Sequence, residues 1–287
     1  MARTRETARP WTQQPQEAVG VSPDWVARGL SFALLRVGGR MLDVLSANGP
    51  LSDSGTTALS PDGIVTDYTG SQGTEFADAA PYRLTGGLTL IAGLEIDAFS
   101  NYTGIAFKQS SYWKASFEWR HGRVSHQNAD PVGVQAVFIR GNDVVTGEYC
   151  SVGGPTTTGR RVSAVSVADD SLLSSPVFYV DGVPLAAATV SASAGTVVDG
   201  GNLRIGQRFD GAVQLDGRVS FLYGFNRQLP DADVAALSAN PWQLFAPRRI
   251  RVPVYGAAPA GVPDITAVIA ESILSDRVSY RATLNYA

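Results

Sequence analysis

The sequence contains only two histidines, His121 and His126, which are five residues apart and flanked by arginines. A catalytic dyad or a metal-binding pair would need a carboxylate or thiolate partner that the fold places beside them. The neighbouring Gly122 and Gln127-Asn128 are typical of a hairpin loop. We therefore predict that both histidines are exposed polar residues without a chemical role.

A pair of carboxyl groups, Glu95 and Asp97, ends the clearest strand of the first half, Leu88 to Ile96. This stretch resembles the Glu-Ile-Asp-x-Glu or Glu-Ile-Asp-x-x-Glu pattern of some jelly-roll glycoside hydrolases, in which the first and last glutamates carry the reaction. The positions of the last glutamate hold Phe99 and Ser100 here. Without that last glutamate, the pattern has no group to protonate the leaving group or to support deglycosylation. We expect solvated acids at a strand end.

Other catalytic signatures are missing from the sequence. No Gly-x-Ser-x-Gly elbow occurs, and Gly153-Gly154 and Gly200-Gly201 lack the strand-to-helix context of a phosphate loop. We therefore predict no catalytic residues, no cofactor and no enzymatic activity.

Alternation of apolar and other residues identifies the strands that must organise the fold. Leu203 to Ile205 predicts a strand that ends at Gly206, and the segment around Val219 to Phe225 has a period of two. Leu222 lies on the polar side of that pattern, so both faces of this strand should be buried. Pro230 and two aspartates then open a short helix that stops before Pro241. Asp181-Gly182, between two apolar runs, predicts a tight hairpin.

This order of elements resembles the end of a laminin G-like or concanavalin A-like jelly roll. The residues that carry the resemblance are Asn226, Arg227, Leu229, Asp233, Val234 and Leu237. Tyr179-Val180-Asp181-Gly182 matches another motif of these domains. The resemblance implies an all-β fold, a two-sheet antiparallel jelly-roll sandwich. It implies no particular function, because lectins, hydrolases and structural modules share this fold.

Composition supports an all-β chain and excludes several functional classes. The 287 residues include 30 glycines and 16 prolines, as expected for many turns, and the net charge of −3 does not suggest nucleic-acid binding. No apolar run is long enough for a membrane span, and the first residues do not form a signal peptide. The single Cys150 is expected to be buried and inert.

Both ends of the chain predict segments that dock elsewhere. We assign residues 1–28 to an extended N-terminal arm, 29–250 to the jelly roll, 251–263 to a linker and 264–287 to a C-terminal β-hairpin. The segments Pro10-Trp11-Thr12-Gln13-Gln14-Pro15-Gln16 and Arg28-Gly29-Leu30 resemble the opening of phage and prophage members of this family. A lone hairpin is marginal in water, so its apolar face needs a partner. The predicted docking residues are Trp11, Tyr280, Leu284 and Tyr286.

Two kinds of binding site remain open on the sandwich. Laminin G-like domains often hold Ca²⁺ at a rim, and several aspartates beside glycines could do so, although each is more simply a turn residue: Asp181, Asp199, Asp210 and Asp216. Tyr112, Trp113 and Trp119 could stack on a sugar, but core packing is the favoured interpretation. Trp242 is expected to close the sandwich end beside the short helix.

The resemblance, together with the two unpartnered ends, predicts a bacteriophage virion structural protein, either a capsid decoration, a head fibre or a tail component. Its partners would be major capsid or tail proteins and further copies of itself, with assembly in the host cytoplasm and final location in the virion. The alternative is a lectin-like module for host-surface glycans. A degenerate glycosidase is the third possibility.

Overall fold

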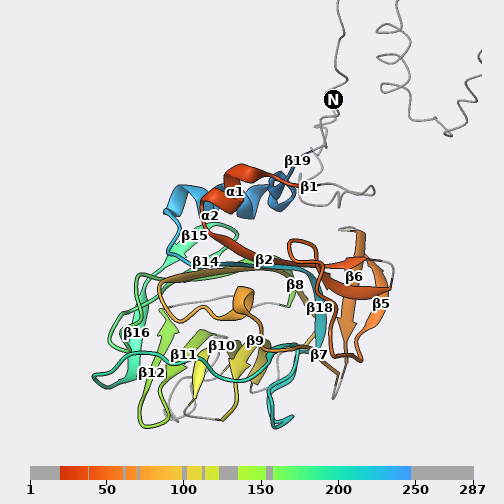
Figure 1. Ribbon diagram of the computed structural model, residues 1–287. Coiled ribbons are helices and arrows are strands. Elements are labelled where there is room, and N and C mark those ends of the chain that lie inside the picture. Colours follow the sequence, from red (N-terminus) through yellow and green to blue (C-terminus); the bar gives the residue numbers. More distant parts are fainter. Residues whose placement is uncertain are drawn as a thin grey trace, which may run out of the picture. The chain divides into compact units, whose positions relative to one another are not determined.

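The computed structural model describes residues 20–37, 39–60, 63–69, 72–98, 102–111, 114–122, 135–152 and 158–246. These residues form two antiparallel sheets packed face to face as a jelly-roll sandwich, as the sequence predicts (Figure 1). Within the described residues no helix is long and apolar enough to cross a membrane.

The nine-stranded sheet has the order β15-β14-β13-β8-β18-β2-β3, with β6 pairing with β18 and β5 with β6. Its strands are β2 (Leu30–Val37), β3 (Arg40–Asp43), β5 (Thr56–Ser60), β6 (Gly63–Tyr68), β8 (Leu88–Ile96), β13 (Gly159–Val167), β14 (Val177–Val180), β15 (Val183–Leu185) and β18 (Gly217–Phe225). The two strands that the sequence identifies most clearly, β8 and β18, pair with each other near its centre.

The eight-stranded sheet has the order β16-β12-β11-β10-β9-β17-β7-β4. Its strands are β4 (Ser52–Asp53), β7 (Thr74–Phe76), β9 (Tyr102–Gln109), β10 (Ala115–Gly122), β11 (Gln135–Gly141), β12 (Thr146–Ser151), β16 (Ala187–Ala192) and β17 (Leu203–Ile205). A 3-10 helix, η2 (Ala80–Tyr82), follows β7 and buries Tyr82 in the core.

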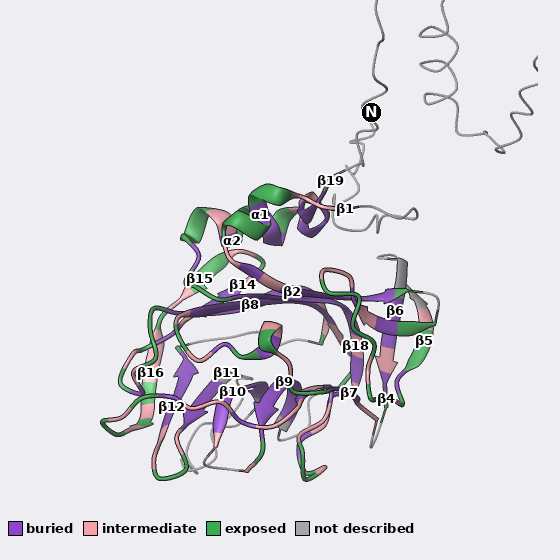
Figure 2. Ribbon diagram, in the orientation of Figure 1, coloured by how far each residue is buried: buried purple, intermediate pink, exposed green. Residues whose placement is uncertain are grey.

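Strand β18 is buried on both faces, as its sequence predicts. One side of the strand, including Val219 and Leu222, belongs to the core between the two sheets. The other side, with Phe221 and Tyr223, belongs to a second apolar cluster on the outer face of the nine-stranded sheet. Figure 2 shows the central strands β2 and β8 of this sheet almost entirely buried.

Helices cover that outer face. They are α1 (Pro23–Ala27), α2 (Asp231–Ala239) and the 3-10 helix η3 (Pro241–Leu244), and beside them β1 (Gly20–Val21) pairs with β19 (Phe245–Ala246). Helix α2 confirms the predicted short helix after Pro230. Trp25 of α1 packs edge-on against Phe225. Residues 20–28, which the sequence assigns to the arm, therefore lie against the sandwich, and residues 1–19 are outside the described residues.

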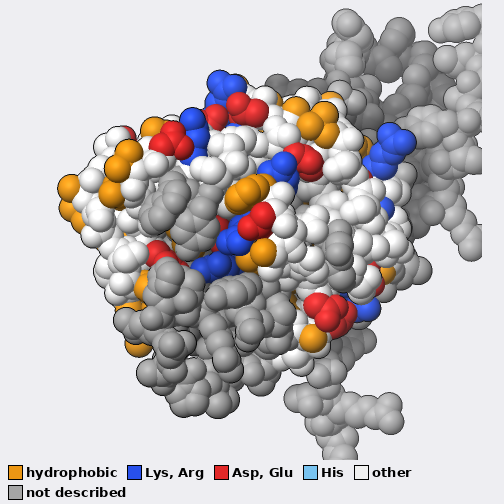
Figure 3. Space-filling view, turned by 90° about the horizontal axis from the view of Figure 1, so that it is seen from below, with side chains coloured by type: hydrophobic (Ala, Val, Ile, Leu, Met, Phe, Trp, Pro, Cys, Tyr) orange, Lys and Arg blue, Asp and Glu red, His pale blue; other side chains and the backbone are white. Residues whose placement is uncertain are grey.

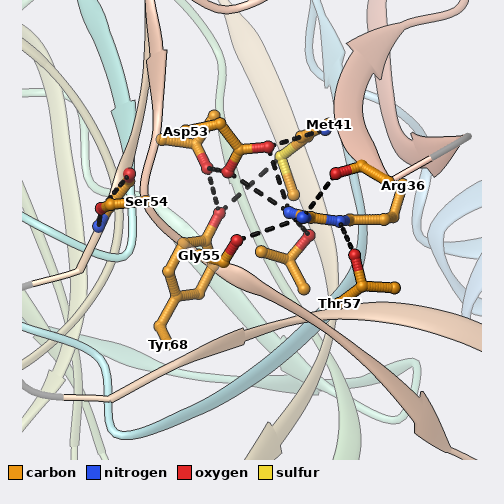
Figure 4. A network of polar contacts seen from close by, with 11 residues as sticks. Arg36, Met41, Asp53, Ser54, Gly55, Thr57 and Tyr68 are labelled. Atoms are coloured by element: carbon orange, nitrogen blue, oxygen red, sulfur yellow. Dashed lines mark hydrogen bonds and ion pairs between the residues drawn. The ribbon is translucent and has the colours of Figure 1, made fainter.

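A buried ion pair holds the two sheets together at one edge (Figure 4). Arg36 of β2 binds Asp53 of β4 with an Nη1–Oδ2 distance of 3.1 Å, and it also donates to the Gly55 carbonyl and the Thr57 hydroxyl. Asp53 accepts in turn from the backbone N–H of Met41. Because the surrounding donors and acceptors complete the pair, we assign it a structural role.

The predicted hairpin at Asp181-Gly182 is confirmed. Both residues have positive φ, +49° and +80°, which defines the type I′ turn that joins β14 to β15. A Cβ atom at Gly182 would lie 2.9 Å from Cα of Ala235 in α2. The turn therefore needs glycine for its backbone conformation and for the approach of the helix.

Two glycine substitutions should separate these requirements. Gly39 has φ +86° and nothing within 4 Å of its Cβ position, so Gly39→Val should lose only roughly 1–2 kcal/mol through backbone strain. Gly182→Val should lower the free energy of unfolding by more than Gly39→Val does, because α2 must also shift. Urea unfolding of both variants measures the difference, and a Gly182→Val curve equal to that of the wild type would contradict the turn assignment.

Candidate functional site

The outer face of the eight-stranded sheet carries charged side chains where β10 crosses its middle. Trp119 of β10 belongs to the inner core, so its neighbours Glu118 and Arg120 face outward. Glu118 pairs with Ile139 of β11, which pairs with Glu148 of β12, and this register places Glu148 on the same face. The sequence therefore brings two glutamates and an arginine together across three strands.

Five side chains form a line of alternating charge, which we call the charge chain: Glu148, Arg120, Glu118, Arg208 and Asp210. Arg120 donates from Nη2 to Glu148 Oε1 over 3.3 Å and from Nη1 to Glu118 Oε1 over 3.0 Å. Nη1 of Arg208 lies 3.6 Å from the same Glu118 oxygen. Arg208 then binds both carboxylate oxygens of Asp210, over 2.9 and 2.7 Å.

The charge chain is deeply buried from Glu148 to Glu118 and becomes more exposed toward Asp210. The side chains of Glu118 and Arg120 are 1% and 2% exposed, whereas Asp210 at the other end is 35% exposed. Burial raises the pKa of Glu118, and the charges of Arg120 and Arg208 oppose that rise. Hydrogen bonds from Arg208 lower the pKa of Asp210. The accessible end of the charge chain is therefore a carboxylate that stays ionised.

An exposed aromatic ring stands at this accessible end. Phe209 lies between Arg208 and Asp210 in the loop that joins β17 to β18, and it is 38% exposed. In Figure 1 this blue-green loop extends beyond the eight-stranded sheet, on the side away from the helices. Figure 3 views this side of the molecule and shows acidic and basic side chains alternating in a band with hydrophobic ones beside it.

This combination suits a polar, uncharged ligand with an apolar face. Carboxylates only accept hydrogen bonds and guanidinium groups only donate them, so an alternating pair presents both functions to a hydroxyl-rich molecule. The ring of Phe209 offers a flat apolar surface beside them. Since the acids and bases of the charge chain nearly balance, the ligand needs no net charge.

Glu95 is not part of this face. It binds Arg218 with an Oε1–Nη1 distance of 3.1 Å, and Asp67 and Asp97 bind the same guanidinium. Asp67 and Glu95 lie on β6 and β8 of the nine-stranded sheet, and Asp97 follows β8, whereas Glu118, Arg120 and Glu148 lie on the eight-stranded sheet. The solvated strand end that the sequence predicts is thus an ion-paired cluster around one arginine.

The prediction for His121 is wrong. This residue lies on β10, not in a loop, and its side chain is completely buried. It continues the inward-facing series that includes Trp119, and the strand runs on to Gly122. Burial, and secondarily the charge of Arg161, lower the pKa of His121 to about 3. His126 lies outside the described residues.

The aromatic residues considered for sugar stacking or for closing the sandwich lie in two places, the core and the outer face of the nine-stranded sheet. Trp119 packs in the core, as the favoured interpretation expects, and Tyr112 and Trp113 lie outside the described residues. Trp242 is buried beside α2 against Phe221, where it covers a sheet face rather than the sandwich end.

Three of the four aspartates considered for calcium have other partners, and the Asp216 carbonyl accepts from the backbone N–H of Asp97. Asp199 binds Lys108 and Arg83, and Asp210 binds Arg208. Asp181 accepts from the backbone N–H of Val162 in its hairpin turn. Among the described residues no group of three or more His, Cys, Asp or Glu side chains could hold a metal ion. The predicted docking residues lie outside the described residues: Trp11, Tyr280, Leu284 and Tyr286.

Comparison by sequence identifies no relative. No protein-family model matches the chain, and no curated protein matches it.

Comparison by structure finds similar folds among solved proteins. The binding domain of Paraclostridial Mosquitocidal Protein 1 has a TM-score of 0.53 at 10% identity, covering 73% of this chain and 52% of that chain. Domain 4 of AbnA, an extracellular arabinanase from Geobacillus stearothermophilus solved with arabinotriose, has a TM-score of 0.52 at 13% identity, covering 73% and 98%. Botulinum neurotoxin type C, in a study of its interaction with two ganglioside molecules, has a TM-score of 0.52 at 12% identity, covering 76% and 52%.

These likenesses establish the β-sandwich fold. The chain spans about half the length of the mosquitocidal and botulinum proteins that it matches, and nearly all of the arabinanase domain. At identities of 10–13%, they do not transfer a binding residue to any position of this chain.

Removing Arg120, the central cation of the charge chain, should show how much its ion pairs contribute to stability. Arg120→Met leaves Glu118 and Glu148 buried without this partner, which should lower the free energy of unfolding by about 3–5 kcal/mol at pH 7. The triple variant with Glu118→Gln and Glu148→Gln should recover most of that loss. Urea unfolding measures both, and an unchanged single variant would contradict the buried ion-pair geometry.

Acid should destabilise the domain through His121. Its folded-state pKa of about 3 lies below the ordinary value of 6.5, so between these values the unfolded chain binds a proton that the folded one does not. Stability from this residue is complete above pH 6.5 and falls on acidification, by at most about 1.4 kcal/mol per pH unit. Unfolding of wild type and His121→Gln at pH 7, 6 and 5 should give converging stabilities. Parallel stability curves would exclude a buried neutral His121.

Proposed function

We propose that this domain binds carbohydrate through the outer face of the eight-stranded sheet. The observation that carries the proposal is the exposed end of the charge chain, where Phe209 stands between Arg208 and Asp210. A sugar ring can stack its apolar face on Phe209 while its hydroxyls donate to Asp210 and accept from Arg208. The buried glutamates and Arg120 hold that end in place.

The placement of the other elements supports this choice of face. The outer face of the nine-stranded sheet is covered by α1, α2 and η3, so it offers no comparable polar surface among the described residues. The structural neighbours include an arabinanase domain solved with arabinotriose and a neurotoxin whose cell entry depends on gangliosides. They support the lectin-like interpretation through fold alone.

A virion structural role is the second candidate. The observation that favours it is the pairing of Gly20 with Ala246, which brings the first and the last described residues together. Anchorage through either end of the chain to a capsid or tail protein would leave the charge chain free to face a host surface. The two functions are therefore compatible: the domain would display its glycan-binding face from a particle.

Binding to immobilised glycans, followed by calorimetry on the best ligand, tests the proposal. The glycans include arabinan oligosaccharides and ganglioside headgroups. Phe209→Ala should weaken binding at least tenfold, about 1.4 kcal/mol or more, through loss of the stacking surface. Phe209→Tyr keeps the ring and should bind as the wild type does.

Leu173→Ala is the matched control, because Leu173 is also an exposed apolar side chain, 56% accessible, and lies in the connection between β13 and β14. It should leave affinity unchanged. Absence of binding to every glycan would contradict the function, and equal losses in Phe209→Ala and Leu173→Ala would contradict the assignment of the site.

A further inference from the structure

Both sheets end at the same side of the sandwich. β15 is the last strand of the nine-stranded sheet, β16 is the last strand of the eight-stranded sheet, and Ala186 alone connects them. Among the described residues β16 pairs with β12 and with no further strand. Figure 1 shows β16 at the left margin of the sandwich. One row of backbone N–H and C=O groups of β16 is therefore free to bind another strand.

Three of the other outer strands have features that hinder such pairing. β4 has only two residues, β3 begins with Arg40 and ends with Asp43, and β15 has Pro184, which lacks an N–H, at its centre. β16 has neither a charged residue nor a proline, and the uncharged stretch around it extends from Val183 to Val198. β5 is uncharged as well and supplies the control below.

Exposed apolar side chains lie at both ends of β16. The backbone N–H of Val152 donates to the carbonyl of Ala186, directly before the first residue of β16. At the other end, the turn that contains Val144 lies beside Gly195, since a Cβ atom on Gly195 would be 3.5 Å from Val145. Val144 and Val152 are both more than half exposed. Figure 3 is turned about the horizontal axis of Figure 1, and it shows hydrophobic side chains along the same left margin.

This edge is complementary to itself. The register of β16 against β12 shifts at Val190, so β16 presents two short runs, one on either side of Val190. A twofold axis at Val190, perpendicular to the sheet, pairs the first run antiparallel with the second run of another copy. The same axis brings Val152 of one copy to the end of β16 where the partner's Val144 lies. Neither run is charged, so two identical edges meet without repulsion.

We propose that two copies of this chain join through β16 into a symmetric dimer, in which the two eight-stranded sheets become one continuous sheet. The pairing gives the free backbone groups of the edge their partners and covers the apolar side chains at its ends. Because the axis is perpendicular to the sheet, the outer faces of both copies lie on the same side, and both Phe209 loops face one surface. That consequence rests on the proposed function, whereas the pairing of β16 does not.

Sedimentation of the full chain at several concentrations, without any glycan, tests the proposal. The wild type should form dimers that dissociate on dilution. Thr189 is exposed, and its two copies in this register are diagonal neighbours about 7 Å apart. Thr189→Lys should therefore raise the dissociation constant at least tenfold, because two ammonium groups repel each other across the axis. Thr56→Lys is the matched control, since Thr56 is an exposed threonine on β5, and it should associate as the wild type does.

A mixture of variants shows whether the occupant of the edge is a second copy. Thr189→Glu alone should associate as weakly as Thr189→Lys alone, and an equimolar mixture of the two should recover association, because opposite charges then meet across the axis. Circular dichroism should show the wild-type fold in each variant, since the substituted side chain is exposed.

Four results would overturn the proposal. The first is a wild type that stays monomeric, as expected where a strand of a different protein occupies the edge. The second is a Thr189→Lys chain that associates as the wild type does, and the third is a mixture that associates no better than its components. The fourth is an equal loss of association in Thr56→Lys and Thr189→Lys.

Discussion

The structure depends on the burial of both faces of one sheet. Strands β8 and β18 are apolar on both sides, so the nine-stranded sheet must be covered twice. The eight-stranded sheet covers one face, and α1, α2 and η3 cover the other. Consequently, the outer face of the eight-stranded sheet is the one broad sheet face, among the described residues, that is free to carry polar groups.

That constraint explains where the charges lie. Strand β10 divides its residues between the two faces, with Phe117 and Trp119 in the core and Glu118 and Arg120 outside. Charges so deeply buried persist only as pairs, which accounts for the alternation from Glu148 to Asp210. Along β10 itself, the inward positions Phe117 and Trp119 are apolar, and the next one, His121, is polar.

Local sequence patterns predict those strands, turns and helices whose conformation is set by neighbouring residues. The alternation around Phe221, the Asp181-Gly182 turn and the helix after Pro230 each depend on neighbouring residues. Strands β1 and β19 are only two residues long each and lie more than two hundred residues apart in the sequence. No local pattern predicts that they pair. The charge chain escapes prediction for a similar reason, because its members come from three separate segments. For His121, the neighbouring glycine and amides indicate a loop, but the strand continues through Gly122.

The central claim is that a glycan binds on the outer face of the eight-stranded sheet, and a crystal structure of the domain with its best glycan ligand tests it most directly. The account predicts a sugar ring stacked on Phe209 with hydroxyls within hydrogen-bond distance of Asp210 and Arg208. A glycan bound against α1, α2 or η3, with Phe209 uncovered, would contradict it.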